Sequence, residues 1–155
     1  MPDADLKTRL QSDLTEAIRA RDEVRAATLR LALTAVRSEE VAGATARTLS
    51  DADVVAVLGR EARKRREALT VYADAGRADR AERESAELAV LETYLPAQLT
   101  DAELSSIVAA AVAQAGAEGA TGPGAMGRVM KAVQPRVAGR ADGGRVAAEV
   151  RRQLA

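Results

Sequence analysis

The stretch SDADVVAVLGREARKRREALTVYADAG, residues 50–76, decides the fold because it carries both end signals of one long helix. Ser50 and Asp53 form a capping box in which Asp replaces the usual Glu, and Gly76 suits the positive φ found just past a helix. Between these signals the apolar side chains recur at helical spacing. They are Val54, Val55, Leu58, Ala62, Leu69 and Tyr72. The stretch therefore predicts a helix that runs to about Ala75.

Similar signals predict three more helices around this one. An apolar stripe over residues 6–18 predicts a first helix, and Asp22 is the expected N-cap of a second. Asp79 is expected to cap a fourth helix, which Pro96 ends. The second helix is apolar around most of its circumference, so we expect it at the centre. The four helices predict an N-terminal bundle over residues 1–95.

Three further helices are predicted after the bundle. A complete capping box at residues 100–103 opens a fifth helix, and Gly116 is expected to close it. A short sixth helix is expected to end before Pro135, and Asp142 caps a seventh. We therefore expect an all-α fold in which residues 96–155 form a compact three-helix tail.

Composition supports helices and excludes several kinds of chemistry. Hydrophobic residues make up 47% of the chain but aromatic residues only 1%, which disfavours strands. Cys and His are absent, so the sequence offers no thiol nucleophile, imidazole base or zinc site of the usual kind. No apolar run is long enough to span a membrane, and residues 1–5 are unlike a signal peptide. We expect a cytoplasmic protein without cofactor or metal.

A short basic run lies inside the long helix and consists of Arg60, Arg63, Lys64, Arg65 and Arg66. Arg65 falls on its apolar side, where an unpaired guanidinium is costly to bury. We expect Arg65 to pair with an acid of the fourth helix, with Glu84 and Glu92 as candidates. The acids of the fourth helix are otherwise interpreted as a solvated face and not as a catalytic pair. They are Glu82, Glu84, Glu87 and Glu92.

A glycine motif in the tail, GPGAMG at residues 122–127, matches the dinucleotide-binding pattern G-x-G-x-x-G. That pattern requires a strand immediately before the loop, whereas a helical pattern precedes this one. A flexible loop is therefore the favoured interpretation.

Opposite charges are separated along the chain although its net charge is zero. Residues 79–103 hold seven acids and two bases, whereas residues 119–155 hold two acids and seven bases. The candidate nucleic-acid-binding residues lie in this basic tail. They are Arg128, Lys131, Arg136, Gly139, Arg140 and Arg145. Clustered Arg and Lys side chains suit phosphates, and the lack of Trp and Phe disfavours stacking on single strands, so a folded RNA fits best.

Several motifs resemble the GatB/YqeY family, and the similarity covers nearly the whole chain. The motifs are YLPAQLT at residues 94–100, MGRVM at 126–130, GRADG at 139–143 and the stretch over residues 61–77. The resemblance is nearest to stand-alone YqeY-like proteins. It implies an all-helical fold whose tail is similar to the C-terminal domain of GatB, one of the subunits of tRNA-dependent amidotransferases. These enzymes are carbon–nitrogen ligases that use glutamine as the amide donor.

In those amidotransferases the tail helps to hold tRNA, while the glutaminase and transamidase chemistry belongs to other domains. The resemblance therefore implies tRNA contacts and no catalysis by this chain itself. It places these contacts at Arg128, Lys131, Gly139, Arg140 and Arg145. The implied partners are tRNA and a tRNA-charging or amidotransferase complex.

Our main hypothesis is a non-catalytic accessory module that binds tRNA, or a tRNA–protein complex, through the basic tail. The alternative is a protein–protein adaptor in which the bundle presents a groove, and it predicts an exposed apolar patch between helices. A third hypothesis is an enzyme that uses carboxylates with a bound nucleotide. Neither DNA nor a membrane is expected as a partner.

Overall fold

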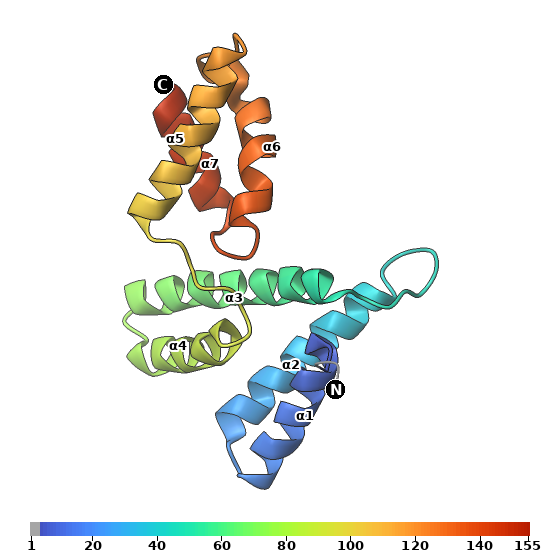
Figure 1. Ribbon diagram of the computed structural model, residues 1–155. Helices are drawn as coiled ribbons and strands as arrows, with labels where there is room; N and C mark the ends of the chain where they lie inside the picture. The colour runs from blue at the N-terminus through green and yellow to red at the C-terminus, as the bar shows by residue number, and fades with distance from the viewer. Residues whose placement is uncertain (1–3) are drawn as a thin grey trace. The chain divides into compact units, whose positions relative to one another are not determined.

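The computed structural model describes residues 4–155, and all of its regular elements are helical (Figure 1). The expectation about a signal peptide falls partly on residues 1–3, which lie outside this range. The helices are α1 (Leu6–Arg19), α2 (Glu23–Glu40), α3 (Asp51–Asp74), α4 (Ala78–Glu92), α5 (Asp101–Ala117), the short 3₁₀ helix η1 (Pro123–Ala125), α6 (Met126–Val137) and α7 (Gly143–Leu154). The predicted all-α fold is confirmed. The chain divides into two compact units, one ending at Leu95 and one spanning Pro96–Ala155.

Most of the predicted helix starts are confirmed by side-chain caps. Each of four residues accepts a hydrogen bond from the backbone N–H three positions later, which satisfies a donor that the helix leaves free. These residues are Asp22, Ser50, Thr100 and Asp142. The capping box at Ser50 is reciprocal, and Gly76 ends α3 with a φ of 71°. Local sequence therefore determines where most of the helices begin.

The predicted ends of α4 are wrong. Asp79 is not the N-cap: α4 begins at Ala78, and Asp79 lies in its first turn, 3.5 Å from Arg77. The N-cap position is instead Arg77, whose side chain makes no capping hydrogen bond. At the other end α4 stops at Glu92, before Pro96 can affect it.

Two predicted ends in the second unit are also wrong. Gly116 lies inside α5, and the chain reverses at Gly119, whose φ is 86° and whose N–H bonds to the Gly116 carbonyl at 3.0 Å. Pro135 lies inside α6 although it has no N–H to donate to the preceding turn. The helix continues because Val137, in its last turn, is 2% exposed and packs into the core.

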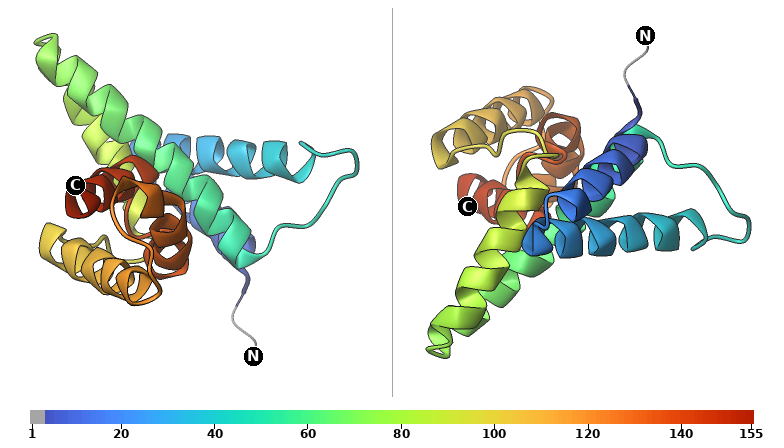
Figure 2. Two further views of the ribbon diagram at one scale, coloured as in Figure 1. Left: turned by 90° about the horizontal axis from the view of Figure 1, so that it is seen from above. Right: turned by 90° about the horizontal axis from the view of Figure 1, so that it is seen from below.

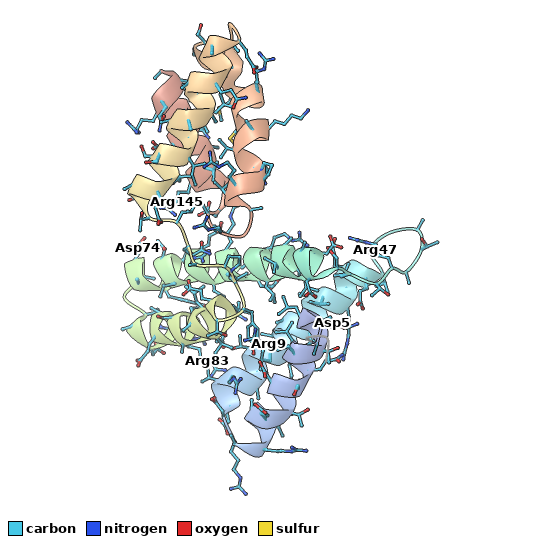
Figure 3. The ribbon with its side chains drawn as sticks, in the orientation of Figure 1. Asp5, Arg9, Arg47, Asp74, Arg83 and Arg145 are labelled. Carbon is cyan, nitrogen blue, oxygen red and sulfur yellow. The ribbon has the colours of Figure 1, made fainter. Side chains whose placement is uncertain are left out.

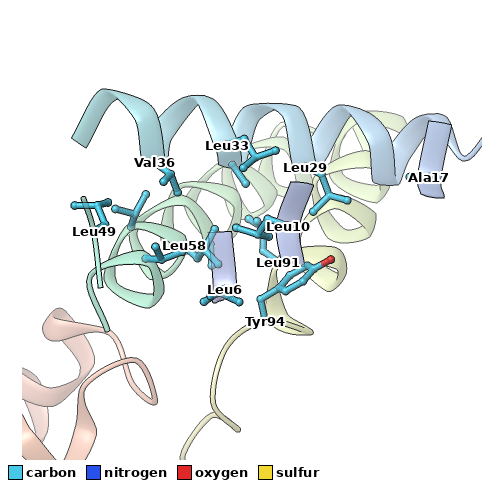
Figure 4. Packing of buried hydrophobic residues seen from close by; sticks show 14 of the residues in the cluster. Leu6, Leu10, Ala17, Leu29, Leu33, Val36, Leu49, Leu58, Leu91 and Tyr94 are labelled. Atoms are coloured by element: carbon cyan, nitrogen blue, oxygen red, sulfur yellow. The ribbon is translucent and has the colours of Figure 1, made fainter. Parts of the chain in front are cut away.

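The first unit is a bundle in which α2 packs against α1, α3 and α4, but α3 also packs against the other three helices. The predicted central place of α2 is therefore only partly right, because Leu31 on its outer face is 50% exposed. Figure 4 shows the core, and Figure 2 shows α3 and α4 side by side with opposite directions. The largest fully buried side chains of this unit are Leu10, Leu29, Val36, Val54, Leu58 and Leu91. Ile18, expected in the apolar stripe of α1, is instead 50% exposed.

The expected ion pair of Arg65 with α4 is present and extends to a second acid. Its Nη1 lies 3.2 Å from Glu84 Oε2 and 2.6 Å from Glu87 Oε2. Glu87 also accepts a 2.6 Å hydrogen bond from Arg83 Nε, whereas Glu92 pairs with a different arginine. Because Glu87 is only 6% exposed, the interpretation of a fully solvated acidic face is wrong at that residue.

A polar cluster ties the end of the first unit to α1. The Tyr94 hydroxyl donates a hydrogen bond to Asp13 Oδ2, and Arg25 Nη2 lies 3.7 Å from the same oxygen. The Arg9 guanidinium lies 5.0 Å from the centroid of the Tyr94 ring, within range of a cation–π contact. Burial of the phenol, reinforced by the Asp13 carboxylate, raises the pKa of Tyr94 to about 12.

We expect Tyr94 to make stability depend on alkaline pH. Its raised pKa means that the folded protein holds the phenol proton more tightly than the unfolded chain does. The resulting stabilisation is complete below the ordinary tyrosine pKa of 10 and is lost as the pH rises towards 12. Urea unfolding followed by circular dichroism should therefore show a steeper alkaline loss in the wild type than in Tyr94→Phe. Parallel pH curves for the two proteins would contradict this.

Candidate nucleic-acid interface

The second unit is a three-helix scaffold that presents its charges outward. α5, α6 and α7 each pack against the other two. The core is formed by aliphatic side chains at helical spacing, so the charged positions fall on the remaining faces. The fully buried core side chains are Val108, Val129, Val133, Val137, Val146 and Val150.

A clasp joins the segment before α5 to the turn between α6 and α7. Gly139 adopts a φ of 73°, a conformation that favours glycine, and so turns the chain between the two helices. The Arg140 carbonyl accepts a 2.7 Å hydrogen bond from Leu99 N–H, and the Gly139 carbonyl accepts a 3.0 Å bond from Gln98 Nε2. Arg140 Nε donates to the Ala97 carbonyl at 3.4 Å. The two side-chain bonds join residues 41 and 43 positions apart in the sequence. Contacts between distant parts of the chain thus fix the turn.

Arg140 and Arg145 both lie beside the beginning of α5. Arg145 Nη2, in the first turn of α7, lies 2.7 Å from Asp101 Oδ1, the first residue of α5 (Figure 3). Arg140 lines an open hollow of about 420 Å³ together with Glu103 and other residues of the first half of α5. Arg136 is exposed in the last turn of α6, just before the clasp.

Arg128 and Lys131 lie beside the other end of α5. Arg128 Nη2 is 3.3 Å from Glu118 Oε2, the residue that caps the end of α5, and both side chains are at least half exposed. Lys131 is exposed, and it lines with Arg128 a hollow of about 330 Å³ between α5 and α6. The other walls of this hollow include the small side chains of Ala111 and Ala132.

The candidate cations thus form two groups and not one. Asp101 and Glu118, which pair with one cation of each group, lie at opposite ends of α5. At the helical rise of 1.5 Å per residue, these ends are roughly 25 Å apart. We call the groups the clasp group (Arg136, Arg140 and Arg145) and the hollow group (Arg128 and Lys131).

Sequence reasoning missed the carboxylates that already contact two of these arginines. Neither the Arg145–Asp101 pair nor the Arg128–Glu118 pair follows from helical periodicity, because each joins two different elements. A third pair was within reach of the sequence, since Glu149 and Arg152 are three positions apart on α7. Hydrogen bonds from Arg152 and then Gln153 lower the pKa of Glu149 to about 2.

Other kinds of site find little support in the described part of the chain. The glycine motif at residues 122–127 comes after α5, so the strand that dinucleotide binding requires is not there. The expected flexible loop is wrong, because residues 123–127 form η1 and the first two residues of α6. Within residues 4–155 no three His, Cys, Asp or Glu side chains are grouped so as to hold a metal ion. No helix in this range is both long and apolar enough to cross a membrane.

A family model described as Yqey-like protein matches residues 7–154, which is nearly the whole chain. The chain belongs to the Yqey-like protein family. This confirms the resemblance seen in the sequence, whose motifs YLPAQLT and GRADG supply the two sides of the clasp. A search of curated proteins found no significant match.

Proposed function

We propose that this Yqey-like protein is a non-catalytic module that binds folded RNA, of the tRNA class, through its tail. The observation that carries the proposal is the pair of cation groups at opposite ends of α5. The resemblance to the tail of amidotransferase GatB supports the same positions. They are Arg128, Lys131, Gly139, Arg140 and Arg145, to which the residue pattern adds Arg136.

The spacing of the two groups suits a duplex region of RNA. Helical RNA is recognised mostly by its shape and its phosphates, and two contacts roughly 25 Å apart along one rigid helix favour a partner of fixed geometry. Five cations supply the phosphate contacts, while Gly139 supplies the backbone turn. The sequence has neither Phe nor Trp, so stacking platforms for single-stranded bases are scarce.

The proposed role is positioning. Contacts to phosphates orient an RNA without reading its sequence, so the tail would hold tRNA while other domains or proteins act on it. Any transamidation that uses glutamine then belongs to those partners, in keeping with the tail of amidotransferase GatB.

Fluorescence anisotropy with labelled tRNA at about 50 mM salt tests this function. We expect a Kd on the order of micromolar, and at least about tenfold weaker binding of a single-stranded RNA of equal length, because it lacks the duplex geometry. Absence of binding, or equal affinity for the single strand, would overturn the proposal.

The carboxylates Asp101 and Glu118 should compete with RNA phosphates for their arginines. We therefore expect Asp101→Asn and Glu118→Gln each to tighten tRNA binding by about threefold at low salt, since surface ion pairs of this kind contribute up to about 1 kcal/mol. Anisotropy titrations measure the change, and Glu82→Gln on α4 is the matched control. Binding that weakens in either variant would count against phosphates at these arginines.

A further inference from the structure

The first unit has an open hollow of about 470 Å³ between α2 and α3. Its apolar wall includes Leu31 and Ala35 from α2 and Val57 from α3. Leu31 is 50% exposed there, although the other leucines in the middle of α2 are buried. The fold thus leaves a large apolar side chain half uncovered beside a depression, which is the usual setting for an anchor of a partner.

The charges around this hollow are arranged with the cations outward. Arg60 pairs with Glu39 at 2.9 Å, and the two side chains are 57% and 35% exposed. Lys64 pairs with Glu61 at 2.8 Å, and here the difference in exposure is larger: the Lys64 side chain is 71% exposed and the Glu61 side chain 19%. A molecule approaching the hollow therefore meets a guanidinium and an ammonium group before it meets the carboxylates.

Further cations lie along the outward face of α2. Arg30 and Arg37 are exposed, and no carboxylate of residues 4–155 lies within ion-pair distance of either. Arg30 precedes Leu31 directly, and Arg37 precedes Ser38, which lines the hollow. The α2 side of the hollow thus adds positive charge without a compensating acid.

We propose that this hollow docks an acidic amphipathic helix of another protein. An apolar side chain of the partner lies against Leu31 and Ala35, while carboxylates on its flanks pair with Arg60 and Lys64. This is the groove mode of helix recognition, in which apolar anchors recur at three and four positions. The proposal concerns the first unit and is independent of RNA binding by the tail.

An acidic helix fits this surface better than RNA does. The wall of the hollow is aliphatic and offers no aromatic ring on which a base can stack. Glu39 and Glu61 line the hollow itself and repel phosphates that enter it. A carboxylate-bearing helix avoids this repulsion, because its apolar side chains enter the hollow while its charges stay at the rim.

The test uses two fluorescein-labelled peptides of about 18 residues, long enough for helix formation. Both carry leucines at helical spacing, with glutamates at the remaining positions in one peptide and lysines in the other. We expect the full-length protein to bind the glutamate peptide with a Kd of about 10 μM and the lysine peptide at least about tenfold more weakly. Equal affinities, or no binding of the glutamate peptide, would overturn the proposal.

Variants of Leu31 locate the binding. Leu31→Asp should weaken binding of the glutamate peptide at least about tenfold, whereas Leu31→Met should preserve it. Val71→Asp is the matched control, because Val71 is 64% exposed on α3 and does not line the hollow. Thermal melts confirm that each variant folds. An equal loss in Val71→Asp would overturn the proposal.

The charge arrangement has its own test. In the double variant Arg60→Glu, Lys64→Glu, the preference should reverse in favour of the lysine peptide. An unchanged preference would contradict docking at this hollow. A homodimer that light scattering detects and that Leu31→Asp abolishes would also contradict the proposal, because a second copy of this chain would then occupy the face. Protection of α2 from hydrogen exchange by bound tRNA would contradict it as well.

Discussion

Replacing Glu87 by glutamine is expected to lower the free energy of unfolding of the first unit by about 2–3 kcal/mol. Glu87 is 6% exposed and pairs at 2.6 Å with both Arg65 and Arg83. Removing its charge leaves the Arg65 guanidinium, which is 17% exposed, with Glu84 as its remaining acid at 3.2 Å. The loss of one partner of a fully buried pair costs about 3–5 kcal/mol, and the remaining acid reduces that figure.

Tyrosine fluorescence during urea unfolding isolates this effect. The chain has two tyrosines and no tryptophan, and Tyr72 and Tyr94 both belong to the first unit. Glu82→Gln is the matched control, since Glu82 is an exposed acid on the same helix and its replacement should change stability by less than about 0.5 kcal/mol. Equal behaviour of the two variants would mean that the cluster around Glu87 contributes no net stability.

The second large effect is expected in the tail. Neutralising its three most exposed candidate cations removes three proposed phosphate contacts, and tRNA affinity should fall by about a hundredfold at 0.1 M salt. The variant is Arg128→Gln, Lys131→Gln, Arg136→Gln. Each phosphate contact releases counterions, so the plot of log association constant against log salt concentration should also become less steep, by about 1 in slope for each cation removed. Anisotropy titrations with tRNA measure both changes.

A control with the same change in net charge separates contact from general attraction. Arg19, Arg30 and Arg37 are exposed on α1 and α2, outside the tail. Their replacement by glutamine should alter tRNA affinity by no more than about threefold, because these charges make none of the proposed phosphate contacts and exposed charges are screened by salt. Equal losses in the two triple variants would show that RNA does not select the tail.

Helix starts were predictable from the sequence because the signals that set them are local. Ser50 and Thr100 each cap a helix through a group three residues away, and their capping boxes do not depend on the rest of the fold. Helix ends were harder to predict. Gly116, Gly119 and Gly122 lie around the end of α5, and the residue type of each suits a turn. The sequence does not show that the chain leaves the helix at Gly119, which its positive φ reveals. Pro135 would end an isolated helix, but burial of Val137 keeps α6 intact.

The candidate site was predictable as a set of residues but not as an arrangement. Charge counts along the chain point to Arg128 and Arg145, yet their division into two groups follows from the packing of the helices, which places the start of α6 beside the end of α5 and the start of α7 beside its beginning. The carboxylate partner of Arg145 is 44 positions away in sequence. The burial of Glu87 was missed because it also depends on a contact between two helices. The sequence shows that α4 is acidic, but it does not show which of its acids pairs with Arg65 of α3.

The salt dependence of tRNA binding tests the central claim most directly. With five cations on phosphates, a plot of the logarithm of the association constant against the logarithm of the salt concentration should be linear, with a slope of roughly −3.5 to −4.5. That result means that the tail binds the RNA backbone through its arginines and lysine. A slope flatter than about −1, in a protein that still binds tRNA, would contradict recognition through these charges.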